Sequence, residues 1–369
     1  MTPMRRILVL AMATCGWIGL AAAPASAHSV SGVSGTNFQT TLQSVTPAVP
    51  GLEVKVVEAG SRLQVENRTG KELLVLGYKG EPYLRIGPEG VFENKLSPAT
   101  YLNKSRKGGT PPPEAENAKV GDTDWAKVSS KPVARWHDHR IHWMGNINPP
   151  DVRNAPGERH VIKMSADSPQ WSVFMKLAGT QDVVARGDLI WVPGPSPLPW
   201  YLLIVVGLAA VVAIGARPGW ARGLAAVTAV LVVVDIFHVI GLGFANAGDL
   251  GYRLGKAFSQ SPLEIFAWLV GGLAVVWLLR RGTDGLPLAA LAGLQVALIG
   301  GFGDLAALSH TVAPFGFGTT LARLCVALSI ALGVGLAVAA GLRIAGVVGP
   351  ARIPAAAQAE EPVAAPTGS

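Results

Sequence analysis

The chain is poor in cysteine and in charge. It has 2 cysteines in 369 residues, and only 15% of its residues are charged whereas 50% are hydrophobic, with a mean hydropathy of +0.37. Cys15 and Cys325 both lie in apolar runs, so residues 28–193 contain no thiol and no disulfide. The composition is too apolar for an ordinary soluble enzyme of this length and places part of the chain in lipid.

Several functional signatures are also missing. Seven of the 31 Lys and Arg residues follow Leu250, and no basic stripe is interleaved with aromatic residues, so a nucleic-acid partner is not expected. The sequence has no phosphate-cradling glycine loop, no nucleophile elbow and no His-Glu-x-x-His helix. No enzyme class is indicated by these motifs.

The N-terminus has the pattern of a secretory signal peptide over residues 1–27. Arg5 and Arg6 precede an apolar run at 7–23, and Ala25-Ser26-Ala27 supplies small residues for cleavage. Cleavage there would make His28 the new N-terminus. Cys15 allows an alternative reading as a lipoprotein cysteine, but the residues before it match that pattern poorly.

Between about residues 51 and 193, short stretches alternate apolar and polar side chains with a period of two. This pattern predicts that residues 28–193 form an extracytoplasmic all-β sandwich, of immunoglobulin-like or cupredoxin-like type, with an exposed loop at 103–131. Residues 28–50 are expected to form an extended arm that ends in a sheet. The predicted strands cover residues 52–56, 63–66, 73–76, 83–86, 159–164, 171–177 and 182–192.

Long apolar runs in residues 198–346 predict an all-α bundle of five transmembrane helices. The expected spans are 198–216, 223–246, 262–279, 286–308 and 319–345, and residues 347–369 form a disordered cytoplasmic tail. If the β domain lies outside a cytoplasmic membrane, six loop arginines fall on the inner side, namely Arg217, Arg222, Arg280, Arg281, Arg343 and Arg352. Three basic residues fall on the outer side, namely Arg253, Lys256 and Arg323. This excess of basic residues on the inner side supports the orientation.

Three of the seven histidines cluster in residues 136–144, Trp-His-Asp-His-Arg-Ile-His-Trp-Met. On a β-strand, His137 and His139 would project from one face and supply half of a copper or zinc site. Completing ligands could be His28, His142 or Met144, or His160 and Met164 on nearby strands, and a thioether favours copper. The alternative is a structural strand in which these histidines hydrogen-bond to Asp138 or to the backbone.

Polar side chains within the spans are a second signal. Asp235 and His238 lie three residues apart on one helix face near the middle of the bilayer, where ionisable groups are usually functional. They are expected either to relay an ion or proton or simply to hydrogen-bond to each other. Asp304 is expected to form an ion pair with Arg323.

Short motifs also carry resemblances. Residues 77–85, 97–103 and 136–144 resemble those of an uncharacterised family of exported actinobacterial membrane proteins, which implies an envelope location. An N-terminal His followed by Trp-His-x-His on a β domain is similar to the copper-binding B subunit of particulate methane monooxygenase. A mature chain that begins with His before a β-sandwich is similar to CopC, whose partner CopD spans the membrane. By position, these resemblances imply His28, His137 and His139 as copper ligands.

The sequence therefore predicts a membrane-anchored extracytoplasmic protein that captures copper, with the helix bundle relaying an ion or proton. The alternative is a non-metal envelope protein whose β domain binds a protein partner or supports a membrane complex.

Overall fold

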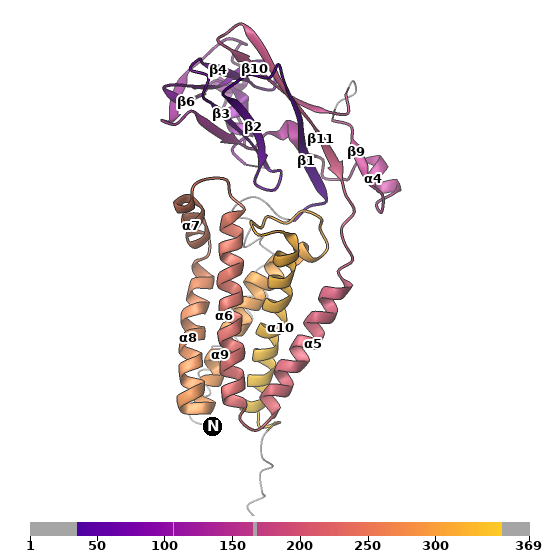
Figure 1. The fold of residues 1–369 in the computed structure, drawn as a ribbon, viewed down its shortest axis with the longest axis vertical. Helices are drawn as coiled ribbons and strands as arrows, with labels where there is room; N and C mark the ends of the chain where they lie inside the picture. Colours follow the sequence, from indigo (N-terminus) through magenta and orange to yellow (C-terminus); the bar gives the residue numbers. More distant parts are fainter. Residues whose placement is uncertain (1–34, 106, 165–167, 349–369) are drawn as a thin grey trace, which may run out of the picture.

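The computed structural model describes residues 35–348 except residues 106 and 165–167. The predicted signal peptide, Cys15 and His28 lie outside the described residues, as do Arg352 and all but the first two residues of the predicted tail. An antiparallel β region stands on one end of a helical region (Figure 1). We call the two ends of the helical region β-proximal and β-distal.

The larger sheet contains eight strands and is antiparallel. Its order is β1-β11-β10-β4-β5-β6-β7, and the short β9 pairs with β11. The strands are β1 (Phe38–Thr46), β4 (Leu73–Leu76), β5 (Pro82–Gly87), β6 (Gly90–Asn94), β7 (Trp125–Ser129), β9 (His160–Ile162), β10 (Trp171–Leu177) and β11 (Gln181–Trp191).

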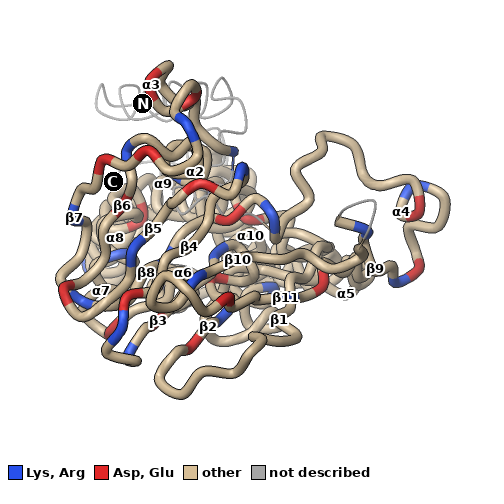
Figure 2. The backbone as a smooth tube through the Cα atoms, turned by 90° about the horizontal axis from the view of Figure 1, so that it is seen from above, with Lys and Arg blue, Asp and Glu red and all other residues tan. Residues whose placement is uncertain are grey.

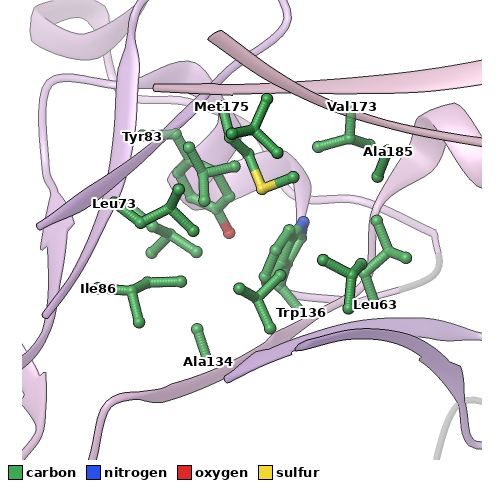
Figure 3. Packing of buried hydrophobic residues seen from close by; sticks show 14 of the residues in the cluster. Leu63, Leu73, Tyr83, Ile86, Ala134, Trp136, Val173, Met175 and Ala185 are labelled. Atoms are coloured by element: carbon green, nitrogen blue, oxygen red, sulfur yellow. The ribbon is translucent and has the colours of Figure 1, made fainter. Parts of the chain in front are cut away.

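The smaller sheet contains β2 (Leu52–Val57), β3 (Arg62–Asn67) and β8 (Val133–Trp136). Its inward side chains meet those of the larger sheet in one core, because alternate residues of each strand point the same way. Leu63 and Trp136 from the small sheet face Met175 and Tyr83 from the large one (Figure 3). All seven strands predicted from the period-two pattern are present, and β1 lies in the predicted arm.

The predicted exposed loop at 103–131 is wrong in its last part. Residues 125–129 form β7, which pairs with β6, and α3 (Pro113–Glu116) lies before it. The guanidinium of Arg85 stacks over both Phe92 and Trp125, at 5.0 and 5.1 Å from the ring centroids. Contacts between distant residues hold this strand, and a local period cannot reveal them. The other short helices of the β region are α2 (Pro98–Leu102), η2 (His139–Ile141) and α4 (Pro150–Asn154).

Four helical stretches in the described part of the chain are long and apolar enough to cross a membrane. They are Leu198–Ala216, Trp220–Phe244, Pro262–Leu308 and Thr319–Ile344. The first, second and fourth are α5, α6 and α10, and the third comprises α8 (Pro262–Arg281), η3 (Gly282–Gly285), α9 (Leu286–Val296), η4 (Ala297–Gly301) and η5 (Phe302–Leu308). A short amphipathic helix, α7 (Leu250–Ser259), precedes α8 at the β-proximal end (Figure 1).

The third stretch folds back on itself, because α8 and α9 pack against each other. The C-cap of α8 is Gly282, whose φ of 58° is unfavourable for a residue with a side chain. Pro287 lies in the first turn of α9, where proline is common. The predicted span at 286–308 is not one continuous α-helix. It changes to a π-helical turn in η4 and to 3-10 geometry in η5, where Asp304 has non-helical dihedral angles.

The β region is attached to the helical region at two places. Next to the start of β1, Thr36 pairs with Val312, and the Thr311 hydroxyl donates to the carbonyl of Val192 at 2.9 Å. On the other side, the Arg135 guanidinium lies 4.8 Å from the centroid of the Tyr252 ring on α7. Seen from above, the sheets lie over the helices and basic and acidic residues are interspersed (Figure 2).

Candidate functional site

The histidine-rich run does not form the predicted strand. Strand β8 ends at Trp136, and a carboxylate oxygen of Asp138 accepts from the Arg140 amide at 3.0 Å, capping the 3-10 turn η2. The expectation that His137 and His139 project side by side from a strand is therefore wrong. The physical reason is that an aspartate caps a turn more readily than it continues a strand.

His137 and His142 converge on one backbone carbonyl. The Nδ1 atom of His137 lies 3.0 Å from the Ser61 oxygen, and Nε2 of His142 lies 2.8 Å from the same oxygen. The Nε atom of Arg62 donates to Nε2 of His137 at 3.0 Å. These bonds engage both ring nitrogens of His137 within the protein.

The His139 ring turns elsewhere. Its Nε2 lies 3.1 Å from the Ser105 carbonyl, and its amide donates to the Tyr78 hydroxyl at 2.9 Å. Burial is the main cause that raises the pKa of Tyr78, so the phenol stays protonated and donates in turn to Asn103. These contacts fix His139 away from His137.

Asp138, which lies between His137 and His139 in the sequence, forms a buried ion pair with Arg140. It accepts from the Arg140 guanidinium at 2.7 and 2.8 Å and from the Trp136 indole at 2.8 Å. Burial acts to raise the pKa of Asp138, but the charge of Arg140 and the hydrogen bonds of Arg140 and Trp136 outweigh it and lower this pKa. This network anchors η2 to the core. The structural alternative for this run is confirmed only in that the three histidine rings lie against backbone carbonyls, whereas the hydrogen bonds of Asp138 go to Arg140 and Trp136.

Four of the sequence-predicted ligand candidates nevertheless line one pocket. His139, His142, Met144 and Met164 border a cavity of about 580 Å³ beside Trp143. Met144 is exposed, whereas His142 is buried. His160 lies apart, with Nε2 2.7 Å from the Ala155 carbonyl. Within the described ranges, no three His, Cys, Asp or Glu side chains are grouped so as to hold a metal ion.

The predicted intramembrane pair lies on α6. Asp235 and His238 are 0% and 2% exposed. Counting along α6 at 1.5 Å per residue, Asp235 is roughly 22 Å from the β-distal end and 13 Å from the β-proximal end. The Trp268 indole of α8 donates to Oδ2 of Asp235 at 2.7 Å. The pair therefore lies in the β-proximal half of the helical region.

Gly300, in the π-helical turn η4, lies directly against both side chains. A Cβ atom at this position would be 2.7 Å from Oδ1 of Asp235 and 3.4 Å from Nδ1 of His238. The two polar atoms therefore face the same point of η4. A π-helical turn widens the helix locally and is often found at functional sites.

Asp304 does not form the predicted ion pair with Arg323. The Oδ2 atom of Asp304 lies 3.5 Å from Nε2 of His238, whereas Arg323 donates to the carbonyls of Ala307 and His310 at 3.1 and 2.9 Å. The prediction was wrong because it assumed a continuous helix, and the non-helical dihedral angles at Asp304 interrupt that helix.

Asp304, His238 and Asp235 thus form a row, which we call the polar row. Phe315 stacks on the imidazole of His238, with ring centroids 5.8 Å apart. Towards the β-distal end, the bundle is packed with apolar side chains, among them Leu224, Leu231, Leu278, Leu286 and Leu336.

Sequence reasoning missed Trp268 and Gly300, which contact the polar row, and two buried carboxylates, Glu264 and Glu58. Trp268 and Gly300 carry no local signal, since apolar helices commonly contain both types. Glu264, 2% exposed and one turn before Trp268 on α8, was detectable as a carboxylate inside the predicted span 262–279. Glu58 lies in the β region and becomes relevant only through the docking of the two regions.

No protein-family model, no curated protein and no solved structure matches this chain.

Proposed function

We propose that this chain is a multi-pass membrane protein whose helical region contains a proton-transfer site made by Asp304, His238 and Asp235. One observation carries the proposal: a buried imidazole lies between two carboxylates at an interruption of a transmembrane helix. Ionisable groups are costly within a bilayer, and they usually mark ion or proton pathways.

The chemistry follows from the two nitrogens of an imidazole. A proton on Oδ2 of Asp304 would transfer to Nε2 of His238, and the proton on Nδ1 would then pass to Oδ1 of Asp235, which faces the same point of η4. Histidine suits this role because its ordinary pKa lies near neutrality and its two nitrogens can exchange protons with different partners. The Trp268 indole bond fixes the Asp235 carboxylate in position to accept.

The polar row borders a cavity at its β-proximal end. The β-proximal end of the polar row reaches a small cavity that Asp304 lines, whereas apolar packing fills the β-distal half of the bundle. This arrangement supports proton uptake from the side on which the β region lies.

The proposed topology has five crossings, with α8 and α9 as separate spans and the β region outside. Arg217, Arg222, Arg280, Arg281 and Arg343 lie at the β-distal ends of their helices. The excess of arginine at this end supports its placement on the cytoplasmic face.

A pH titration of Trp268 tests the proposal. The full-length protein is labelled with 5-fluorotryptophan in lipid nanodiscs, and its 19F resonance is assigned with Trp268→Phe. Because the indole donates to Asp235, we expect this resonance to shift with pH. His238→Gln should remove the shift near neutrality, whereas His160→Gln, a matched change in the β region, should leave it in place. A Trp268 resonance that is insensitive to pH in the wild-type protein refutes the proposal.

A second candidate function is capture of copper by the β region. It is favoured by the gathering of His139, His142, Met144 and Met164 around one pocket. Thioethers together with imidazoles select Cu(I), so the proposed ion is Cu(I). This site keeps four of the predicted ligand candidates, His139, His142, Met144 and Met164, and leaves out His137 of the strand-face pair.

Competition with a Cu(I) chelator tests this candidate on the full-length protein. Replacing Met144 and Met164 together by Leu should weaken Cu(I) binding, because leucine preserves volume and removes both sulfur atoms. Met175→Leu, a change in the core away from the pocket, should bind Cu(I) as the wild type does. Equal Cu(I) affinity in the double variant and the wild type rejects the site, and the β region is then a partner-binding or scaffolding module.

A further inference from the structure

Glu58 occupies an unusual position in the turn between β2 and β3. Glu58 and Ala59 both have φ 55°, followed by Gly60 with φ 88°. Residues with a Cβ atom rarely adopt this left-handed conformation, and non-glycine residues held in it are concentrated at functional sites. The turn therefore holds two residues with side chains in a conformation that glycine favours.

This turn directs the Glu58 side chain to the helical region. The side chain is 8% exposed. Its Oε1 atom accepts from the amide of Ala247, just after α6, and from Nη1 of Arg135, both at 3.4 Å. Its Oε2 atom lies 3.1 Å from Nε of Arg62. Two guanidinium groups of the β region thus hold a carboxylate at the boundary with the membrane domain.

Glu58 and Asp304 line the same cavity. Its volume of about 30 Å³ is room for roughly two water molecules. Polar residues make up much of the remaining wall: Asn246, Lys256, Gln260 and Ser261. Water between the two carboxylates would join Glu58 to the outer end of the polar row.

We infer that Glu58 is the residue through which Asp304 exchanges protons with the external solution. The inference rests on the proposed proton-transfer site and extends it into the β region. The charged groups that face Glu58 are Arg62 and Arg135 from the β region, and Lys256 and Asp304 from the helical region. The β region then lies over the β-proximal end of the polar row, and its residue Glu58 is one of the groups that exchange protons there.

Kinetics separate this inference from the proposed function. Full-length protein in nanodiscs is subjected to a stopped-flow pH jump in weak buffer with the dye pyranine, and subtracting the His238→Gln trace isolates the phase due to the polar row. Glu58→Gln should slow this phase at least tenfold without changing its amplitude. Glu53→Gln is the matched control, because Glu53 is half exposed on β2 and pairs only with Lys55 among the recorded contacts.

A second variant covers the case in which glutamine disturbs the turn. In Glu58→Ala the His238-dependent phase should be slow, and its rate should recover when formate is added, because a small acid can replace the lost carboxylate. An unchanged rate in Glu58→Gln overturns the inference, as does loss of the Trp268 titration in that variant or the absence of formate rescue. Absence of a His238-dependent phase in the wild-type protein instead overturns the proposed function and this inference together.

Discussion

Replacing Gly300 by alanine is the most direct perturbation of the polar row. The added methyl group would lie 2.7 Å from Oδ1 of Asp235, closer than a carbon and an oxygen approach without repulsion. The carboxylate cannot move freely, because Trp268 holds its other oxygen at 2.7 Å. Overpacking of this kind costs about 1–3 kcal/mol. Removing a glycine from a helix offsets about 1 kcal/mol of that, so we expect a net loss of up to about 2 kcal/mol.

Two measurements on the full-length protein check this prediction. The thermal midpoint should fall by about 2–4 °C for each kcal/mol lost. The 19F resonance of Trp268 should also shift, because moving Asp235 lengthens the indole bond. Gly272→Ala is the matched control, since Gly272 is exposed on α8 and a Cβ there meets nothing within 4 Å. Its midpoint should stay constant or rise.

Equal midpoints for the two alanine variants, with an unmoved Trp268 resonance, would refute the packing of Gly300 against Asp235. The arrangement of the polar row around η4 would then be incorrect, and with it the geometric basis of the proton-transfer site.

Three further predictions concern the β region. Leu63→Ala, at a side chain 0% exposed between the two sheets, should destabilise the protein by about 2–5 kcal/mol in chemical unfolding. Arg140→Gln should cost about 3–5 kcal/mol at neutral pH, because it leaves the Asp138 carboxylate buried without its counter-charge. Since the folded-state pKa of Asp138 lies below its ordinary 3.8, the stability from this pair is present above pH 3.8 and is lost as the pH falls through the folded-state pKa. The stability difference between wild type and Arg140→Gln should therefore shrink in acid unfolding experiments, and a constant difference would contradict this assignment. Tyr78→Phe should cost about 1–3 kcal/mol, because it removes the acceptor of the His139 amide, and an unchanged midpoint would show that water replaces it.

The sequence alone predicted seven of the eleven strands of the described residues, and the long apolar helices. Strands at 52–57 and 171–177 follow from alternation, because each buries one face in a shared core. The long helices follow from the length of their apolar runs, which are long enough to cross a bilayer. Local patterns carry both kinds of information.

Local patterns failed wherever the outcome depended on residues distant in the sequence. Strand β7 was missed because its pairing with β6 and the stacking of Arg85 on Trp125 are long-range contacts. The prediction for the histidine run failed for a local reason instead: Asp138 caps a turn through the Arg140 amide, two residues along, and the alternating histidines outweighed that sign of a turn.

The chain's sequence by itself determined that Asp235 and His238 lie on one face of an apolar helix, since their spacing and apolar context require it. Only the tertiary structure decided that Asp304 faces His238 and that Glu58 reaches the same cavity. The physical reason is that the interruption of the helix at η4 and η5 and the docking of the β region bring together side chains from elements far apart in the chain, and no local periodicity encodes that approach.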